Sequence, residues 1–514
     1  MSSHIFLYGP SGAGKSVTGK ALAEMLDLPF VDVDSVVEQT VGESISDLMA
    51  RRGERFFRDL ETAAVKQAVS GPEAVVALGG GALLRDENRA LVQSAGPVIL
   101  LSADISTLSH RLTQDGNKRP LLTGNLEAKL EALLARRKEH YASFPLQVDA
   151  SLSPEEVAWE IQRCIGRYRL RGMGAPYDVM VQDEGLGQIG LTMKARGLSG
   201  PVLVLSDTHV APLYAGRVAA SLKMAGYEAA QLVIPAGEAH KTAKTVMSIW
   251  RGALEAGLDR RSVIVALGGG VVGDLAGFAA ATYMRGCHWV AVPTTLLAMV
   301  DASLGGKTGF DLPEGKNLVG AFYPPRLVLA DVQVLATLPE RELRAGLAEV
   351  VKHSVIADPQ LFDLCSRGWE AVTARLPEVV RRAMSVKVRI IEEDPYERGG
   401  RAALNFGHTV GHAVELVSQF RLLHGEAVAV GMVAEARLAE RLTVAGPGVS
   451  EAVRGTLAGL GLPVEIPKHL PRARLLRAMR VDKKMAAGVV RFALPVKVGE
   501  MKVGVAVENL EEVL

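Results

Sequence analysis

The sequence predicts an α/β protein of several domains, on three observations. A short apolar strand at 4–8 runs into a glycine-rich turn and then a helical pattern, and the same order recurs at 262–286. From residue 338 onward the apolar residues keep a helical spacing to the end of the chain. Finally, 514 residues are too many for a single core and suggest about two to four domains.

The domain boundaries follow from a break in this periodicity. Glycine, arginine and proline interrupt the regular spacing between the two α/β patterns, which is typical of a short linker. The expected segments are an α/β domain with a parallel sheet at 1–165, a linker at 166–177, a second α/β domain at 178–337 and a helical domain at 338–514.

The composition argues against binding to nucleic acid or membranes. The chain has 58 basic and 57 acidic residues, with no basic stripe. Cys164, Cys287 and Cys365 are widely spaced and form no CxxC pair, which fits a reducing compartment. The N-terminus lacks the pattern of a signal peptide, and no uncharged apolar run reaches the roughly 18 residues of a membrane helix. We therefore expect a cytoplasmic protein.

The turn after the first strand, GPSGAGKS at 9–16, fits the phosphate-binding pattern G-x-x-x-x-G-K-[ST] in full. Its glycines let the backbone N–H groups point inward at phosphates, and the helix that follows adds positive potential. Lys15 is expected to reach the β- and γ-phosphates of ATP, and the Ser16 hydroxyl to bind Mg²⁺. The alternative is an ordinary glycine-rich turn, which the complete motif between a strand and a helix disfavours.

Charged side chains follow this loop along the chain. Asp32 and Asp34 are expected on one side of a second strand at its C-terminal end, where α/β sheets bind ligands. One carboxylate would serve Mg²⁺ and the other an acceptor hydroxyl, unless both are solvated turn residues. Several arginines near a phosphate loop also indicate an anionic acceptor. The arginines and the glycine run among them are Arg58, Gly79, Gly80, Gly81, Arg119 (in RPLL), Arg136 and Arg137.

The second half uses a similar glycine-rich turn. ALGGG occurs at 77–81 and again at 266–270, in different surroundings, so it is a shared way to bring backbone close to a ligand. GGGVVGDLAG is moderate evidence for a diphosphate site. Asp301, Lys307 and Lys316 are expected on glycine-rich loops. Two lysines there suggest an anionic, phosphorylated substrate, although solvated loop lysines are common.

Three of the 11 histidines cluster in one short stretch. The apolar spacing predicts a helix with His408 and His412 on one face, about 6 Å apart at Cβ. With His424 just past this helix, the arrangement matches the way divalent metals are held. Two satisfied histidines on an ordinary helix are the alternative. The carboxylates of Glu426 and, on a separate helix, Glu349 favour the metal.

Residues 1 to about 165 resemble shikimate kinase over that family's full length, with the phosphate loop, D-x-D, F-R, GGG and RPLL in the same order. The resemblance implies a P-loop kinase domain that phosphorylates the shikimate 3-hydroxyl with ATP and Mg²⁺. Lys15 and Arg119 would stabilise developing charge, and Asp34 would orient the hydroxyl. The implied contacts are Gly12, Ala13, Gly14, Lys15, Ser16, Val17 and Arg119 for ATP and Mg²⁺, and Asp34, Arg58, Gly80 and Arg137 for shikimate.

Residues from about 175 to 514 resemble 3-dehydroquinate synthase, again over the full family length. The matching pieces are GGGVVGDLAG, PTTLLA-x-VD-x-S-x-GGKTG, GKNLVGAF, AEVVK, R-x-x-LNFGHT-x-GH, HGEAVA-x-GM and DKK. The resemblance implies a Rossmann-like NAD-binding subdomain, a helical metal- and substrate-binding subdomain, and a homodimer formed through this half. The implied reaction converts 3-deoxy-D-arabino-heptulosonate 7-phosphate into 3-dehydroquinate and phosphate, with NAD⁺ reduced and reoxidised in each turnover.

The resemblance assigns the histidines differently from spacing alone. It implies that Glu349, His408 and His424 hold Zn²⁺ or Co²⁺, and that His412 is catalytic, together with Lys352 and Asn405. The implied NAD contacts are Glu238, Lys241, Gly269, Gly270, Val271, Asp274, Thr294, Thr295, Lys307, Lys316 and Thr337. The implied substrate contacts are Asp301, Lys307, Asn317, Lys352, Lys387, Arg401, Asn405, His412 and Lys484. One departure is Ala236, where the family commonly has Asp.

Three alternatives remain open at this stage. The second half could be a related sugar-phosphate cyclase that makes a cyclitol, or an NAD- and metal-dependent polyol dehydrogenase. A dehydrogenase would release stoichiometric NADH, whereas a synthase releases phosphate and no net NADH. The first half could be a docking module that keeps its phosphate loop only for folding.

Overall fold

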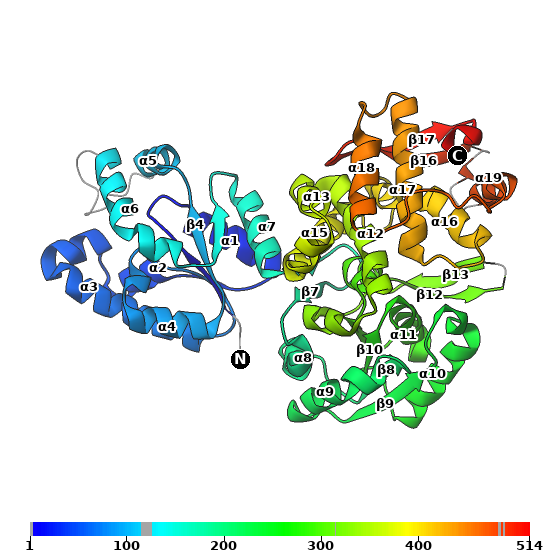
Figure 1. Cartoon of the computed structure of the whole chain (residues 1–514). Helices are drawn as coiled ribbons and strands as arrows, with labels where there is room; N and C mark the ends of the chain where they lie inside the picture. The colour runs from blue at the N-terminus through cyan, green and yellow to red at the C-terminus, as the bar shows by residue number, and fades with distance from the viewer. Residues whose placement is uncertain (1–3, 115–125, 314, 482–484, 487–488) are drawn as a thin grey trace. The chain divides into compact units, whose positions relative to one another are not determined.

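The computed structural model of the chain describes residues 4–114, 126–313, 315–481, 485–486 and 489–514. The chain divides into two compact units, Met1–Arg169 and Leu170–Leu514, and each has its own parallel sheet (Figure 1). The boundary falls inside the segment predicted as a linker. That segment is not irregular throughout, because it contains the strand β6 (Arg167–Leu170).

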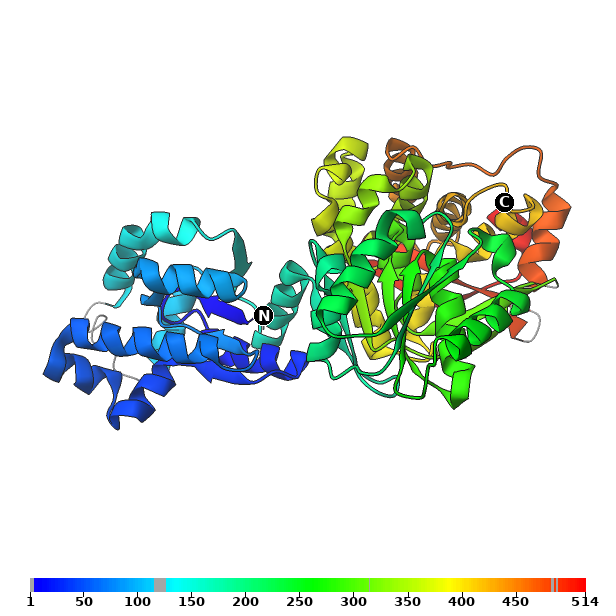
Figure 2. The same ribbon diagram turned by 90° about the horizontal axis from the view of Figure 1, so that it is seen from below.

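The first unit is built on a five-stranded parallel sheet in the order β2-β3-β1-β4-β5. The first strand therefore lies at the centre, and all four of its residues are buried. Burial on both faces is expected of a parallel sheet, and Figure 2 shows helices on both sides of these strands. The strands are β1 (Ile5–Tyr8), β2 (Phe30–Asp32), β3 (Val75–Ala77), β4 (Val98–Ser102) and β5 (Leu146–Asp149).

The helices of the first unit confirm the predicted strand–loop–helix order at the phosphate loop. The first helix begins directly after Gly14, whose positive φ of 82° favours glycine. The helices are α1 (Lys15–Leu26), α2 (Val33–Val41), α3 (Ile45–Ser70), α4 (Asp86–Ala95), α5 (Ile105–Gln114), α6 (Leu126–Ala142) and α7 (Pro154–Ile165).

The expected placement of the two aspartates on one strand is wrong. β2 ends at Asp32, and Asp34 lies in the first turn of α2. The reason is local, because the Asp32 carboxylate accepts hydrogen bonds from the backbone N–H groups of Asp34 (3.1 Å) and Ser35 (3.3 Å). This side-chain cap starts a helix where the alternating pattern predicts more strand.

The second unit begins with an α/β layer. Its sheet has the order β6-β7-β14-β11-β10-β8-β9, its neighbouring strands from β7 to β9 are parallel, and β10 and β11 lie in its middle. These strands are β7 (Tyr177–Val181), β8 (Val202–Asp207), β9 (Ala229–Ile234), β10 (Val263–Gly268), β11 (His288–Pro293) and β14 (Leu327–Ala330). The helices are α8 (Gly185–Ala195), α9 (Ala211–Met224), α10 (Ala243–Glu255) and α11 (Gly270–Thr282).

A hairpin replaces the loops that were expected around the second-unit lysines. Lys307 begins β12 (Lys307–Leu312), and Lys316 lies in β13 (Gly315–Phe322), which pairs with it in antiparallel register. Gly309 faces Gly320 across this pair, and a Cβ on either would clash with the opposite backbone. Repeated glycines, which suggested a loop, instead allow two strands to approach closely.

Helices make up most of the remaining chain, as predicted. They are α12 (Glu340–Ala357), α13 (Pro359–Ser366), α14 (Trp369–Thr373), α15 (Leu376–Glu393), α16 (His408–Val417), α17 (His424–Arg441), α18 (Val449–Gly459) and α19 (Arg472–Val481). The expectation that this pattern runs to the end is wrong, because a three-stranded antiparallel sheet follows. Its strands are β15 (Met485–Ala486), β16 (Val489–Lys497) and β17 (Glu500–Val507).

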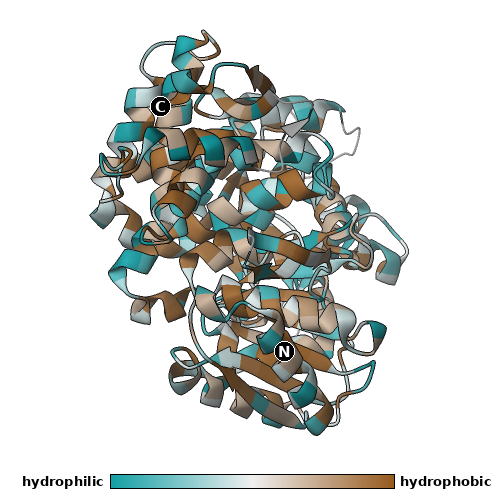
Figure 3. Cartoon of the chain, turned by 90° about the vertical axis from the view of Figure 1, so that its right-hand side faces the viewer, coloured by the Kyte–Doolittle hydropathy of each residue, from teal (hydrophilic) through white to brown (hydrophobic). Residues whose placement is uncertain are grey.

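The core of the helical part holds the two histidine-bearing helices in place. Val410 and Val414 of α16 and Val430 of α17 pack with Phe492 and Leu494 of β16 in one buried cluster. In Figure 3 the helices carry both hydrophilic and hydrophobic faces, as expected of helices that cover a core. Among the residues that the structure describes, no helix has the length and apolar character needed to cross a membrane.

Candidate active sites

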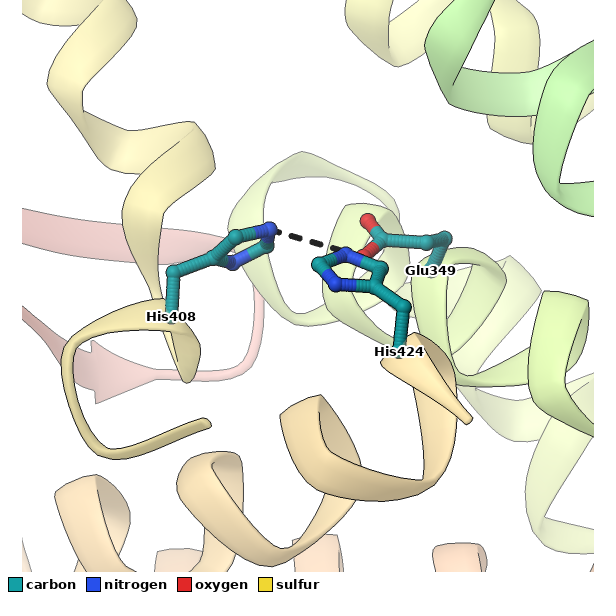
Figure 4. Close-up of side chains that lie close together, drawn as sticks. All are labelled: Glu349, His408 and His424. Atoms are coloured by element: carbon teal, nitrogen blue, oxygen red, sulfur yellow. Dashed lines mark ion pairs between the residues drawn. The ribbon is translucent and has the colours of Figure 1, made fainter. Parts of the chain in front are cut away.

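Three side chains that are far apart in sequence converge in the second unit. Glu349 comes from α12, and His408 and His424 are the first residues of α16 and α17. Their ligand atoms lie within 4.8 Å of one another. Glu349 Oε1 is 3.6 Å from His408 Nε2 and 3.5 Å from His424 Nε2, and Figure 4 shows the three side chains pointing toward a common centre. This is the donor set that the sequence predicts for a metal.

The position of His408 depends on a carboxylate from the neighbouring helix. Gly407, with φ of 79°, precedes α16, and no side chain of its own caps this helix. Instead Glu435 of α17 is fully buried and accepts hydrogen bonds from the backbone N–H of Gly407 (2.7 Å) and of Val410 (3.1 Å). A negative charge at a helix N-terminus satisfies free N–H groups and the helix dipole.

Replacing Glu435 by glutamine is expected to lower the free energy of unfolding by about 2 kcal/mol, because hydrogen bonds to a charged acceptor contribute about 1.5–3 kcal/mol. The amide would keep one acceptor and would present N–H groups to a backbone N–H. The denaturant midpoint of the full chain measures the change. Glu451→Gln, at an exposed glutamate, serves as the control and should change it little. Equal midpoints for both variants would contradict the capping role.

The charges at the three-residue cluster suit a cation. Glu349 is fully buried and contacts the Lys352 ammonium. Burial alone would raise the pKa of Glu349, but Lys352 lowers it below its usual range, so the carboxylate stays charged. Burial and Lys352 hold the pKa of His408 well below its usual value, so this imidazole stays neutral. Within the described part of the chain, neither Glu349 oxygen meets the geometry of a hydrogen bond. A carboxylate and neutral imidazole therefore fit Zn²⁺ or Co²⁺.

The third histidine carries a different charge state in this arrangement. Burial would lower the pKa of His424, but Glu349 and Glu415 together raise it to about 10. Without a metal the ring therefore keeps both N–H protons, and a metal bound at Nε2 would take the place of one of them. His412, one turn after His408, is exposed, and its ring centre lies 5.2 Å from that of His408 and 5.9 Å from that of His424. It borders the cluster but is outside the set of three converging ligand atoms.

Two lysines and an aspartate lie beside this cluster. Lys387 Nζ lies 2.8 Å from Asp301 Oδ1, and the buried Lys352 Nζ lies 3.7 Å from the same atom. Burial would raise the pKa of Asp301, but these lysines hold it well below its usual range. His353 and Glu349 also approach Asp301 closely enough for a second set of ligand atoms. The Lys352 and Lys387 ammonium groups already pair with the two carboxylates of this second set, which disfavours another cation there.

The predicted nucleotide residues surround the end of the parallel sheet. Gly269 and Gly270 start α11, where free N–H groups favour an anionic diphosphate. A pocket opens there, between the ends of β10 and β11 and the start of the helix, and Pro293 and Ser303 contribute to its lining. Val271, Thr294 and Thr295 follow the same two strands. The exposed Thr337 lies farther along the chain, and its hydroxyl is 2.5 Å from that of Tyr214.

The hairpin connects the nucleotide residues with one another. Lys241 Nζ is 2.6 Å from Asp274 Oδ2 and donates a hydrogen bond of 2.6 Å to Asn317. Burial raises the pKa of Asp274 to about 6 against the effect of Lys241. Asn317, which the resemblance implies as a substrate contact, therefore lies against residues implied for NAD. Lys316 Nζ, its neighbour, is 3.3 Å from Glu238.

The remaining predicted substrate residues gather on the loop before α16. The Lys307 ammonium contacts Glu397, and the Asn405 amide donates a hydrogen bond of 3.0 Å to the same carboxylate. Arg401 is 2% exposed and donates to the backbone carbonyl of Pro395. Glu397 therefore joins a hairpin residue to the histidine-bearing segment. Lys484 lies outside the described residues.

In the first unit, the phosphate loop has the predicted form. Lys15 Nζ points into the loop and donates hydrogen bonds to the carbonyls of Gly9 (2.9 Å) and Pro10 (3.0 Å). The Ser16 hydroxyl donates to Asp32 Oδ2 at 2.5 Å, which places a carboxylate beside the predicted Mg²⁺ position. Gly12, Ala13, Gly14 and Val17 complete the loop and the first turn of α1. Arg119 lies outside the described residues.

The predicted shikimate residues surround the glycine run after β3. Arg137 Nη1 donates a hydrogen bond of 2.6 Å to the Gly80 carbonyl. A Cβ at Gly81 would clash with the Arg58 guanidinium, and one at Gly79 would clash with Asp34 and Glu61. The absence of side chains on this glycine run therefore leaves room for Arg58, Asp34 and Arg137 to lie directly against its backbone.

Sequence reasoning missed several carboxylates of these sites. Glu61 is fully buried and pairs with Arg58 at 2.8 Å. Burial raises the pKa of Glu61, with Arg58 opposing it. Glu415 and Glu435 were also missed in the second unit. Glu415 could have been found from its position, because it lies seven residues, or about two helical turns, after His408 and so falls on the same face of the helix. A charged residue on a face that packs inward needs a partner.

These folds and sites define two enzyme classes in one chain: a P-loop phosphotransferase, and an α/β nucleotide-binding enzyme with a metal-type His₂Glu cluster. Residues 231–345 match the 3-dehydroquinate synthase N-terminal family model, and residues 346–485 match the C-terminal one. Residues 11–166 match the shikimate kinase model. The chain belongs to the 3-dehydroquinate synthase family and carries a shikimate kinase domain before it.

Individual relatives agree with this assignment. The second half is 49% identical to a 3-dehydroquinate synthase of Pelobacter propionicus over 62% of this chain and 89% of the relative. Two solved structures are also similar. A 2-deoxy-scyllo-inosose synthase complexed with carbaglucose-6-phosphate, NAD⁺ and Co²⁺ has a TM-score of 0.60 and 29% identity, over 66% of this chain and 94% of that one. A 2-epi-5-epi-valiolone synthase from Streptomyces hygroscopicus with NAD⁺ and Zn²⁺ bound has a TM-score of 0.60 and 32% identity, over 67% of this chain and 96% of that one.

Proposed function

We propose that the synthase half works with NAD⁺ and with Zn²⁺ or Co²⁺ held by Glu349, His408 and His424, and that the kinase half works with ATP and Mg²⁺. The observation that carries the proposal is the convergence of these three ligand atoms within 4.8 Å beside a buried pair of lysines. The named relatives with NAD⁺ and Zn²⁺ or Co²⁺ support it.

The proposed substrate of the synthase half is 3-deoxy-D-arabino-heptulosonate 7-phosphate, and the products are 3-dehydroquinate and phosphate. When bound, the metal would lower the pKa of a substrate hydroxyl, and NAD⁺ would take and return its hydride. Lys352 and Lys387 would hold anionic substrate groups, because both ammonium groups lie around Asp301 beside the proposed metal site. The exposed His412, at the border of the metal cluster, would move a proton.

The remaining proposed contacts follow from the clusters around the hairpin and the sheet end. Lys307 and Asn317 of the hairpin and Arg401 and Asn405 of the segment before α16 would hold the substrate. Lys484 remains a proposed substrate contact from sequence resemblance alone. The free N–H groups at the start of α11 would bind the NAD diphosphate. The other proposed NAD contacts are Glu238, Lys241, Val271, Asp274, Thr294, Thr295, Lys307, Lys316 and Thr337.

In the kinase half, Lys15 would bind the β- and γ-phosphates and stabilise the charge that develops during transfer. Ser16 would bind Mg²⁺, and Asp32 supports this role because it accepts the Ser16 hydrogen bond. Asp34 would orient the shikimate 3-hydroxyl, while Arg58 and Arg137 hold the carboxylate. Arg119 remains a proposed nucleotide contact from sequence resemblance alone.

Phosphate release from 3-deoxy-D-arabino-heptulosonate 7-phosphate by the full chain tests the synthase proposal. The release is expected to require NAD⁺, to stop on chelation, to return with Zn²⁺ and to leave no net NADH. Stoichiometric NADH would indicate a polyol dehydrogenase instead. Absence of release, with release from a sugar phosphate, would indicate a cyclitol synthase. The higher identity to the named 3-dehydroquinate synthase favours the first outcome.

The pH dependence of the synthase activity is expected to follow the protonation of the Lys387 ammonium. Burial, with help from Lys352 and against Asp301, lowers the pKa of this lysine to about 8. The positive charge is therefore present below that pH and is lost above it. We expect kcat/KM for the anionic substrate to fall by about tenfold per pH unit on the alkaline side.

Lys387→Arg checks this assignment because arginine keeps its charge over the whole range. The alkaline limb should move upward in pH, even if the rate at neutral pH is lower. An alkaline limb at the same pH in both proteins would assign it to another group. The kinase activity of each sample, measured at neutral pH, confirms equal amounts of folded chain.

We propose a homodimer formed through the synthase half and a cytoplasmic location for the chain. The dimer rests on the family resemblance, and light scattering of the purified chain tests it. The location is supported by the three free cysteines, two of them buried, which fit a reducing compartment.

A further inference from the structure

One buried carboxylate touches both of the proposed cofactor sites. Glu415 lies on α16, is 6% exposed, and directs one oxygen at His424 and the other at Lys316. Its Oε2 is 3.3 Å from His424 Nδ1, and its Oε1 is 2.8 Å from Lys316 Nζ. Because the two oxygens belong to one rigid plane, a rotation that improves one contact also changes the other.

The contact with His424 has the geometry of a ligand support. The ring presents Nε2 to Glu349, at 3.5 Å, and Nδ1 to Glu415. A carboxylate that accepts from one imidazole nitrogen fixes the ring orientation and leaves the other nitrogen directed at the metal. Removal of such a support usually lowers metal affinity by about 10- to 100-fold.

The contact with Lys316 extends toward the proposed nucleotide site. Besides Glu415, Lys316 Nζ lies 3.3 Å from Glu238 and 4.4 Å from the centre of the Phe420 ring. Phe420 has φ of 59° and is about half exposed. A strained backbone that holds an exposed aromatic ring against an ammonium indicates that the position of this lysine matters. Glu415 and Phe420 thus restrict Lys316 from two sides.

We propose that Glu415 is a positioning residue shared by the two sites: it orients His424 for the metal and Lys316 for the nucleotide. The divalent metal and NAD⁺ therefore bind with positive coupling, each raising the affinity for the other. The proposal rests on the cofactors named under the proposed function. A bound metal fixes His424, His424 fixes the plane of the Glu415 carboxylate, and this plane fixes Lys316.

Glu415→Gln tests the shared role, because an amide has only one acceptor oxygen. If that oxygen faces His424, the amide N–H groups face the Lys316 ammonium, so one of the two contacts is lost. The metal-depleted full chain is titrated with Co²⁺ by its visible absorption, without ATP. NAD⁺ affinity is measured by calorimetry with and without Co²⁺. Glu340→Gln, at a largely exposed glutamate of α12, is the matched control.

In the wild type and in Glu340→Gln, Co²⁺ is expected to raise NAD⁺ affinity by at least about fivefold. In Glu415→Gln, the ratio of NAD⁺ affinities with and without Co²⁺ should approach one, because the amide can keep only one of the two contacts. An unchanged ratio in Glu415→Gln would overturn the inference. A wild type that binds Co²⁺ and NAD⁺ without coupling would overturn it too and leave the proposed function intact. A wild type that binds neither would overturn both.

Lys316→Met keeps the test open if Glu415→Gln does not fold. This change removes the contact between Lys316 and Glu415 and leaves the contact between His424 and Glu415 in place. Co²⁺ affinity in the absence of NAD⁺ should stay within about twofold, while the coupling ratio falls toward one. A coupling ratio equal to that of the wild type would overturn the proposed path through Glu415.

Discussion

Replacing Glu349 by glutamine is expected to lower the kcat/KM of the synthase by about a thousandfold or more and to leave shikimate phosphorylation within about twofold. A metal acting on a substrate oxygen is worth several kcal/mol, and each 1.36 kcal/mol is about tenfold in rate. Glutamine removes the only carboxylate among the three converging ligands, so metal content should fall with activity. The second activity of the same chain serves as an internal control.

The same change also affects stability. Lys352 is 1% exposed and contacts Glu349, so among the described residues glutamine leaves this buried ammonium with the more distant Asp301, 3.7 Å away, as its counter-ion. Breaking a buried pair on one side costs about 3–5 kcal/mol. Circular dichroism on heating separates this loss from the loss of metal, and Glu340→Gln on the same helix is the control. A Glu349→Gln chain that keeps one metal per synthase site and full activity would contradict the assignment.

Replacing Lys15 by methionine is expected to lower shikimate phosphorylation by about 100- to 1000-fold, the usual effect of removing one donor aimed at developing charge. Methionine keeps an unbranched stem of similar length, so the change is mainly the loss of the ammonium. This group already lies inside the phosphate loop, hydrogen-bonded to the carbonyls of Gly9 and Pro10.

Lys20→Met is the matched control, because Lys20 lies on the same helix, is exposed and is five residues farther from the loop. Its phosphorylation rate should equal that of the wild type. Coupled assay of ADP release measures both variants, with synthase activity as the internal standard. An unchanged rate in Lys15→Met would favour the alternative in which the first unit is only a docking module.

The sequence predicted the elements whose signals are local and continuous. The phosphate loop, the glycine turn before α11 and the two helical histidines each follow from a motif together with the pattern that flanks it. The resemblance to known families supplied the choice to exclude His412 from the metal ligands, which spacing alone would have included. The structure agrees with that choice to the extent that the ligand atoms of Glu349, His408 and His424 converge, while His412 is exposed.

The failures have a common physical reason, which is that a distant or competing contact decided the local structure. A side-chain cap from Asp32 ended the strand that the pattern extended to Asp34. Facing glycines formed a hairpin where their number suggested loops. The roles of Glu415 and Glu435 depend on partners in other elements, and no spacing rule within one helix predicts them.

The hairpin of β12 and β13 has a consequence for how the specificity of this enzyme can change. Lys307, at one end, touches the loop before α16, while Lys316, near the other, reaches Glu238 and Glu415. Gly309 and Gly320 fix the register between these ends, and a shift of one residue would turn every side chain to the opposite face. With the proposed roles of Lys307 and Lys316, an insertion in this hairpin that changes the substrate preference would therefore also change the nucleotide preference.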